Sequence, residues 1–153
     1  METVEKLAGV LDAQSAVLKK LIAVAEEEME ALISGDAGGV LRAAAEQEKL
    51  TAAIAGLENE RCAVQQLLEE ELALPRNGKL AELLHSLPVE YKKVLAALTE
   101  RLAGDVLELL RLQSRICFLI QRGLMLEEAV ARTLCREDYA GAGSRSGLVD
   151  RSV

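Results

Sequence analysis

The residue types that usually carry out catalysis are scarce and scattered in this chain. His85 is the only histidine, and no Cys, Ser or carboxylate lies at a recurring catalytic or metal-ligand spacing from it. The acidic runs at 26–30 and 69–71 could suggest a divalent cation, but they lack a companion histidine, and consecutive positions on a helix point in different directions. The favoured interpretations are an ordinary connector residue for His85 and a solvated helix face for each acidic run.

The cysteines and glycines offer no better candidate for chemistry. Cys62, Cys117 and Cys135 are widely spaced and form no CxxC pair, so we interpret them as small apolar residues in a reducing compartment. The glycine-rich stretches at 35–39 and 141–147 follow no predicted strand, which favours a turn and a tail over phosphate-binding loops. The sequence therefore predicts no enzyme, no cofactor and no metal site.

The charge of the chain favours a protein partner. Residues 1–87 hold eight Lys or Arg against sixteen Asp or Glu, or −8, whereas residues 88–136 hold eight against six, or +2. One Phe, two Tyr and no Trp are present. An acidic body without a basic stripe or aromatic platforms argues against nucleic acid as the partner.

The location predicted for the chain is cytoplasmic. Its N-terminus has no basic-then-apolar signal pattern, and no apolar run approaches the roughly eighteen residues needed to span a membrane. We therefore expect a protein that does not span a membrane.

Three long amphipathic helices must position whatever site exists. Ala, Leu, Glu, Lys, Arg and Gln dominate the composition, which predicts an all-α fold. Apolar residues recur with a seven-residue pattern along 4–32, 40–68 and 91–130. The stretches "SGDAGG" at 34–39 and "LPRNG" at 74–78 interrupt these patterns. Four polar residues interrupt the stripes and are expected to set the register of packing or to reach water: Gln14, Gln47, Arg61 and Asp105.

These breaks predict an elongated antiparallel hairpin of residues 2–34 and 37–72, with a longer third helix that begins near Pro88. Residues 88 to about 122 are expected to pack on the hairpin as a three-helix, coiled-coil-like bundle. We predict a single helical domain over residues 1–136 and a flexible C-terminal tail over residues 137–153.

The end of the third helix is unusually apolar for a chain terminus. At 1.5 Å per residue, the first helix is about 50 Å long and the third about 70 Å, which leaves roughly 20 Å of the third helix without intramolecular neighbours. That overhang carries Leu124, Met125, Leu126, Val130 and Leu134. Two interpretations stay open: a docking helix for a partner, or a segment that folds back at Gly123 or is buried in a homodimer.

The order of several phrases resembles the FlgN family of flagellar export chaperones. These phrases are "ALISGDAGGVLRAAAEQEKLTAAIAGLENER" at 31–61 and "LQSRICFLIQ" at 112–121, followed by "DYAGAG" at 138–143. The family often has two asparagines three residues apart ahead of the paired aliphatic residues. This chain has Gln113 and Ile116 there, ahead of Leu119 and Ile120.

The resemblance implies a cytoplasmic chaperone that binds the apolar C-terminal segments of the hook-associated proteins, which form the hook-filament junction. It also implies delivery of these clients to the cytosolic domain of the flagellar type III export gate, where Tyr139 matches the family's docking tyrosine. We expect the client-binding residues to be Leu119, Ile120, Leu124, Met125, Leu126, Val130 and Leu134. The alternative is a non-enzymatic coiled-coil tether or adaptor that self-associates, as a homo-oligomer, through the same helix.

Overall fold

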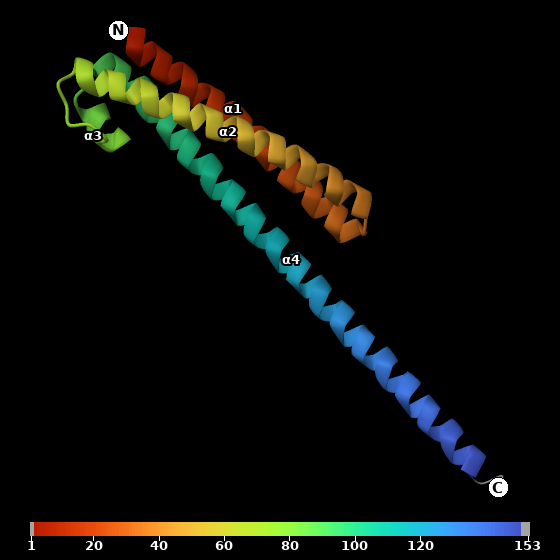
Figure 1. The fold of residues 1–153 in the computed structure, drawn as a ribbon. Helices are drawn as coiled ribbons and strands as arrows, with labels where there is room; N and C mark the ends of the chain where they lie inside the picture. Colours follow the sequence, from red (N-terminus) through yellow and green to blue (C-terminus); the bar gives the residue numbers. More distant parts are fainter. Residues whose placement is uncertain (1, 151–153) are drawn as a thin grey trace. The chain divides into compact units, whose positions relative to one another are not determined.

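The computed structural model describes the backbone of residues 2–150 and the side chains of residues 2–137 (Figure 1). The described part contains four α-helices and no strand: α1 (Glu2–Ser34), α2 (Ala37–Glu71), α3 (Leu80–His85) and α4 (Val89–Asp150). The chain divides into two compact units, Met1–Ile116 and Cys117–Val153. The all-α prediction is confirmed, whereas the boundary between a domain at 1–136 and a flexible tail at 137–153 stays a prediction.

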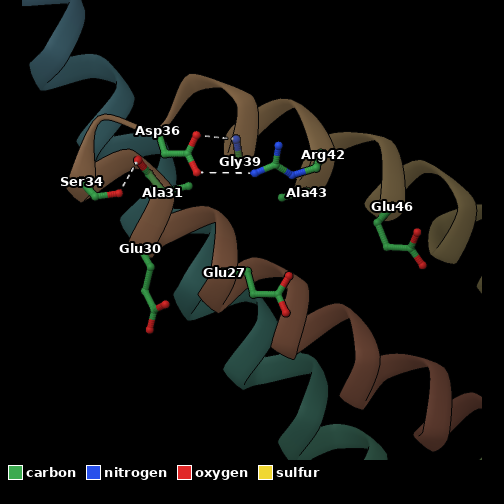
Figure 2. A pocket seen from close by; sticks show the side chains of 9 residues that line it. All are labelled: Glu27, Glu30, Ala31, Ser34, Asp36, Gly39, Arg42, Ala43 and Glu46. Carbon is green, nitrogen blue, oxygen red and sulfur yellow. Dashed lines mark hydrogen bonds and ion pairs between the residues drawn. The ribbon is translucent and has the colours of Figure 1, made fainter.

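The turn between α1 and α2 is fixed by backbone and side-chain hydrogen bonds (Figure 2). Gly35 adopts a φ of 73°, and the amide of Asp36 donates to the carbonyl of Ala31 at 2.9 Å, which is the geometry of a Schellman cap. Oδ1 of Asp36 then accepts from the amide of Gly39 at 2.9 Å and so caps the start of α2. A Cβ on Gly39 would lie 2.5 Å from the Asp36 carboxylate. A larger residue at position 39 would therefore displace the Asp36 cap, one of the hydrogen bonds that fix the turn.

Two buried clusters hold the first unit together. In the first cluster all the helices of the unit meet: Val4, Leu7 and Leu11 of α1, Val64 and Leu68 of α2, Leu83 and Leu84 of α3, Leu87, and Leu95 and Leu98 of α4. The second cluster joins only α1 and α4, through Ala25, Leu112 and Ile116, with Ile22, Met29, Leu32 and Leu109 packed against it. The third long helix therefore packs on α1 along the unit, but it shares a core with α2 only at the end where α3 lies.

This arrangement explains why the predicted stripe of α2 is only partly buried. Ile54 and Leu57 are half-buried, whereas Leu18 of α1 is 7% exposed. The middle of α2 packs on α1 alone, so its apolar side chains are covered from one side only. Prediction from periodicity could not distinguish one covering neighbour from two.

Three of the polar residues that interrupt the stripes form hydrogen bonds between helices, as expected of residues that set register. Nε2 of Gln14 donates to Glu58 at 2.9 Å and Nε2 of Gln47 donates to Glu28 at 2.6 Å, so both join α1 to α2. Asp105 of α4 accepts from the hydroxyl of Ser15 of α1 at 3.4 Å.

One acidic residue lies in the interior, contrary to the interpretation of both acidic runs as solvated faces. Glu69 is 1% exposed and accepts from Nε2 of Gln65 at 2.8 Å and from the amide of Asn77 at 2.9 Å. Nε2 of Gln65 also donates to the carbonyl of Gly78 at 2.8 Å. A buried carboxylate needs such partners, and here they fix the connector that leads from α2 to α3.

Burial of adjacent leucines in α2 predicts very different effects of truncation. Leu68 is 0% exposed in the first cluster, whereas Leu67 is 54% exposed. Leu68→Ala should lower the free energy of unfolding by about 2–5 kcal/mol because it leaves a cavity in the first cluster. Leu67→Ala is the matched control and should change it by less than about 0.5 kcal/mol. Urea titration followed by circular dichroism measures both, and equal losses would contradict the described core.

The Glu58 carboxylate predicts a specific dependence of stability on pH. Hydrogen bonds from Arg61, aided by Gln14, lower its pKa from the ordinary 4.5 to about 2. Because the pKa is lower in the folded state, the interaction stabilises the fold above about pH 4.5 and is lost as the pH falls towards 2. The Glu58 side chain is 49% exposed, so solvent screening limits its contribution to about 1 kcal/mol or less.

We therefore expect Glu58→Gln to be less stable than the parent at pH 7, with a difference that shrinks as the pH falls below 4.5. Urea unfolding at several pH values measures this difference. A gap that stays constant from pH 7 down to pH 2.5 would be inconsistent with the Glu58–Arg61 interaction.

Candidate functional site: the apolar end of helix α4

The residues that could have carried catalysis are not brought together. His85 ends α3 at the surface, with Nδ1 3.3 Å from Nζ of Lys92. No group of three or more His, Cys, Asp or Glu among the described residues could hold a metal ion. Cys62, Cys117 and Cys135 are free and exposed, and their interpretation as small apolar residues in a reducing compartment stays a prediction.

The hairpin turn borders a hollow of about 630 Å³ whose chemistry is acidic. Figure 2 shows the carboxylates of Glu27, Glu30 and Glu46 around it, with Asp36 facing Arg42. The Arg42 guanidinium lies 3.5 Å from the Asp36 carboxylate, so this cation stabilises the turn. The hollow contains no nucleophile paired with a base and offers no evident reaction.

The strongest candidate site is the apolar surface of the second unit. Leu124, Met125, Leu126, Val130 and Leu134 are all more than half exposed, from 51% for Val130 to 71% for Met125. Ile120 is 40% exposed and Leu119 is half-buried. A soluble protein rarely leaves such a series uncovered unless the surface binds another molecule.

Helical geometry places five of the seven predicted client-binding residues on one face. Successive residues turn by about 100°, so Leu119, Ile120, Leu126, Val130 and Leu134 fall within an arc of about 120°. We call these five residues the apolar stripe. Leu124 lies at its edge, and Met125 lies on the opposite side of the helix. The prediction grouped these residues by their apolar character and did not separate the two sides.

Phe118 is an exposed aromatic residue that the sequence analysis missed. It is 56% exposed, and the guanidinium carbon of Arg122, one turn later, lies 5.7 Å from the ring centroid. Phe118 shares its face with Met125 because seven residues make about two turns. This seven-residue spacing was the signal that could have found the pair.

The apolar stripe continues the sequence register of the second cluster. Leu112, which is 2% exposed in the first unit, is followed at seven-residue intervals by Leu119 and Leu126. The same spacing leads from buried Ile116 through Gly123 to Val130. A pattern that builds a core up to Ile116 thus provides an exposed surface from Cys117 onwards. The side chain of Tyr139, the predicted docking residue for the export gate, lies outside the described residues.

Comparison with known proteins matches most of this chain. A family model described as FlgN protein matches residues 1–134, which include the whole apolar stripe and end before Tyr139. No curated protein and no solved structure gives a significant match. In the described part of the chain, no helix has an apolar stretch long enough to cross a bilayer.

A charged substitution should affect stability differently at two equivalent positions of the seven-residue pattern. Leu112 and Leu126 are two heptads apart, but Leu112 is buried and Leu126 is 67% exposed. Leu112→Asp should lower the unfolding midpoint strongly because an unpaired carboxylate would enter the second cluster. Leu126→Asp should change the free energy of unfolding by less than about 0.5 kcal/mol. Thermal unfolding of both variants tests this, and a large loss in Leu126→Asp would mean that the stripe is covered within the protein.

Proposed function

Because the chain belongs to the FlgN family of flagellar export chaperones, we propose that it binds hook-filament junction proteins in the cytoplasm and delivers them to the flagellar type III export gate. The family generally binds hook-associated proteins. The observation that carries the proposal for this chain is the exposed apolar stripe of α4. The stripe offers an apolar client segment a surface that needs no prior unfolding of the chaperone.

The chemistry of the stripe suits a client that is held reversibly. Fully burying five aliphatic side chains would contribute about 7–15 kcal/mol gross, but these side chains are already partly covered. Burying the remainder contributes roughly half of that amount, whereas association costs about 4–15 kcal/mol. The stripe therefore needs further contacts from the client, and the resulting complex is one that an export gate can take apart.

The client segment that fits best is an apolar C-terminal helix of a hook-associated protein. An amphipathic helix buries residues at i, i+3, i+4 and i+7 against such a stripe. Covering these residues in the cytoplasm would prevent the client from associating too early. No step requires catalysis, so we propose that the protein is not an enzyme and acts without a cofactor.

Handing over the client requires a second contact, which we assign to Tyr139 from the resemblance of "DYAGAG" to the family's tail. A tyrosine combines an apolar ring with a hydroxyl group, which suits a compact contact with another protein. Tyr139 follows Leu134 by five residues. Gate docking and client binding can therefore use different residues.

The alternative function is a coiled-coil tether that self-associates through the stripe. The sustained seven-residue pattern favours it, because coiled coils bury such stripes against a second copy. Light scattering at several protein concentrations separates the two functions before any client is added. A client-binding chaperone remains at one mass, whereas a tether that self-associates reversibly increases in mass with concentration.

The proposed separation of client binding from gate docking predicts that two variants affect two different affinities. Leu126→Asp combined with Val130→Asp places two charges on the apolar stripe, and client affinity should fall at least a hundredfold because burying unpaired charges costs several kcal/mol. Tyr139→Ala should leave client affinity within a few-fold and should weaken binding to the cytosolic domain of the export gate.

Calorimetry with a hook-associated protein and with the gate domain measures both affinities for both variants. Equal loss of client binding in the two variants would refute the separation of roles. If neither variant affects client binding, the self-associating tether becomes the better account.

A further inference from the structure

The second unit carries a basic face on the side of α4 away from the apolar stripe. By helical spacing, Phe118, Arg122, Arg132 and Arg136 all lie within about 60° of Met125. Glu127 and Glu137 fall on the side of the stripe, whereas Glu128 lies about 60° from Met125 and pairs with Arg132. The described segment therefore has one apolar face and a second face that combines two large apolar side chains with three guanidinium groups and one carboxylate, that of Glu128. We call this second face the basic face.

The side chains of the basic face are available for binding. Phe118 and Met125 are 56% and 71% exposed. Arg132 pairs with Glu128 at 3.3 Å, but both side chains are at least 70% exposed, so this pair is weak. Among the described side chains, Arg122 and Arg136 form no ion pair. Arg122 instead stacks on Phe118, and such an exposed aromatic–arginine pair has the composition of an interface hot spot.

We propose that the basic face binds an acidic amphipathic helix of a partner protein while the apolar stripe holds the client. The proposal that both are bound together rests on the proposed function, because it takes the stripe as the client site. Apolar side chains of the partner pack between Phe118 and Met125, which lie about 10.5 Å apart along the helix axis. Its carboxylates pair with the arginines, which bind carboxylates bidentately.

Charge distinguishes this partner from an anionic membrane surface. The whole chain carries a net charge of −7, so an extended anionic bilayer repels it. A short acidic helix senses mainly the charges within a Debye length of about 8 Å, and at the basic face three arginines outnumber the one carboxylate of Glu128. Two large apolar side chains are also few for a helix that lies in a bilayer interface.

The test uses a matched pair of synthetic helical peptides of about 20 residues. Both carry Leu on one face, and the remaining positions are mainly Glu in one peptide and Lys in the other. Because the protein is acidic overall, non-specific attraction favours the Lys peptide. Fluorescence anisotropy with the full-length protein should nevertheless show the Glu peptide binding at least about tenfold more tightly, with an affinity that falls as salt is added.

Variants assign the binding to this face. Phe118→Ala and Arg122→Glu should each weaken binding of the Glu peptide by about fivefold or more. Leu126→Asp combined with Val130→Asp alters the stripe, and should leave the peptide affinity within about twofold. Leu41→Ala removes a leucine of α2 that is 71% exposed, more than Phe118, and is the control for Phe118→Ala. Circular dichroism verifies that every variant is folded.

Three outcomes would overturn the proposal. The first is a failure of the peptide test. Either the Lys peptide binds as tightly as the Glu peptide or more tightly, or Phe118→Ala leaves the affinity for the Glu peptide unchanged. The second is that the protein binds phosphatidylcholine vesicles with about 30% phosphatidylglycerol through Phe118 and does not bind the Glu peptide. This result would assign the face to a membrane. The third is concentration-dependent self-association that Phe118→Ala abolishes, which would assign it to a second copy of the chain.

The peptide assay contains no client, so it succeeds or fails separately from the proposed function. If the Glu peptide binds as expected but no hook-associated protein binds, the basic face stands and the client assignment fails. The reverse result retains the client site and removes the basic face. Adding the Glu peptide to a preformed client complex then tests simultaneous binding, and displacement of the client would contradict it.

Discussion

The first unit depends on one apolar face of α1. Val4, Leu11, Leu18 and Ala25 follow one another at seven-residue intervals and are all buried. Both clusters use residues of this face, whereas α2 and α3 contribute only to the first cluster. Side chains that pack at fixed intervals along two helices fix the register of the pair. A shift of one helix by one residue would turn its apolar face away from the other helix. Helix α1 is therefore the element that α4 contacts in both clusters of the first unit.

The period of the apolar residues and the residues that end helices were sufficient to predict the helices. The predicted hairpin of residues 2–34 and 37–72 matches α1 (Glu2–Ser34) and α2 (Ala37–Glu71) closely, and α4 starts at Val89, next to the predicted Pro88. These boundaries have local causes, such as the left-handed Gly35 and the Asp36 cap, which a sequence displays directly. The burial of Glu69 has a different cause, because its partner Asn77, and the Gly78 carbonyl that accepts from Gln65, belong to a connector whose path no local pattern specifies.

The candidate site was predictable in composition but only partly in geometry. A count of apolar residues found the surface, and five of its members do share a face. Met125 was grouped with them although the helical angle places it on the other side, beside Phe118. Grouping residues by apolar character alone assigns every apolar residue to the same face. A second face with different chemistry is found only when each residue is assigned its angle around the helix. No sequence pattern indicates that the Phe118 ring is exposed or that the Arg122 guanidinium lies over it.

The tight turn at Gly35 and Asp36 has a consequence for synthesis on the ribosome. Only two residues separate α1 from α2, so closing the hairpin costs little chain entropy and can occur as soon as residues near 72 have emerged. Leu95, Leu112 and Ile116, which cover the remaining side of α1, are made later. At a translation rate of about 5–20 residues per second, the nascent hairpin exposes part of its own apolar face for a few seconds before α4 arrives. A protein of a chaperone family thus passes, during its own synthesis, through an interval in which part of its own apolar surface is uncovered.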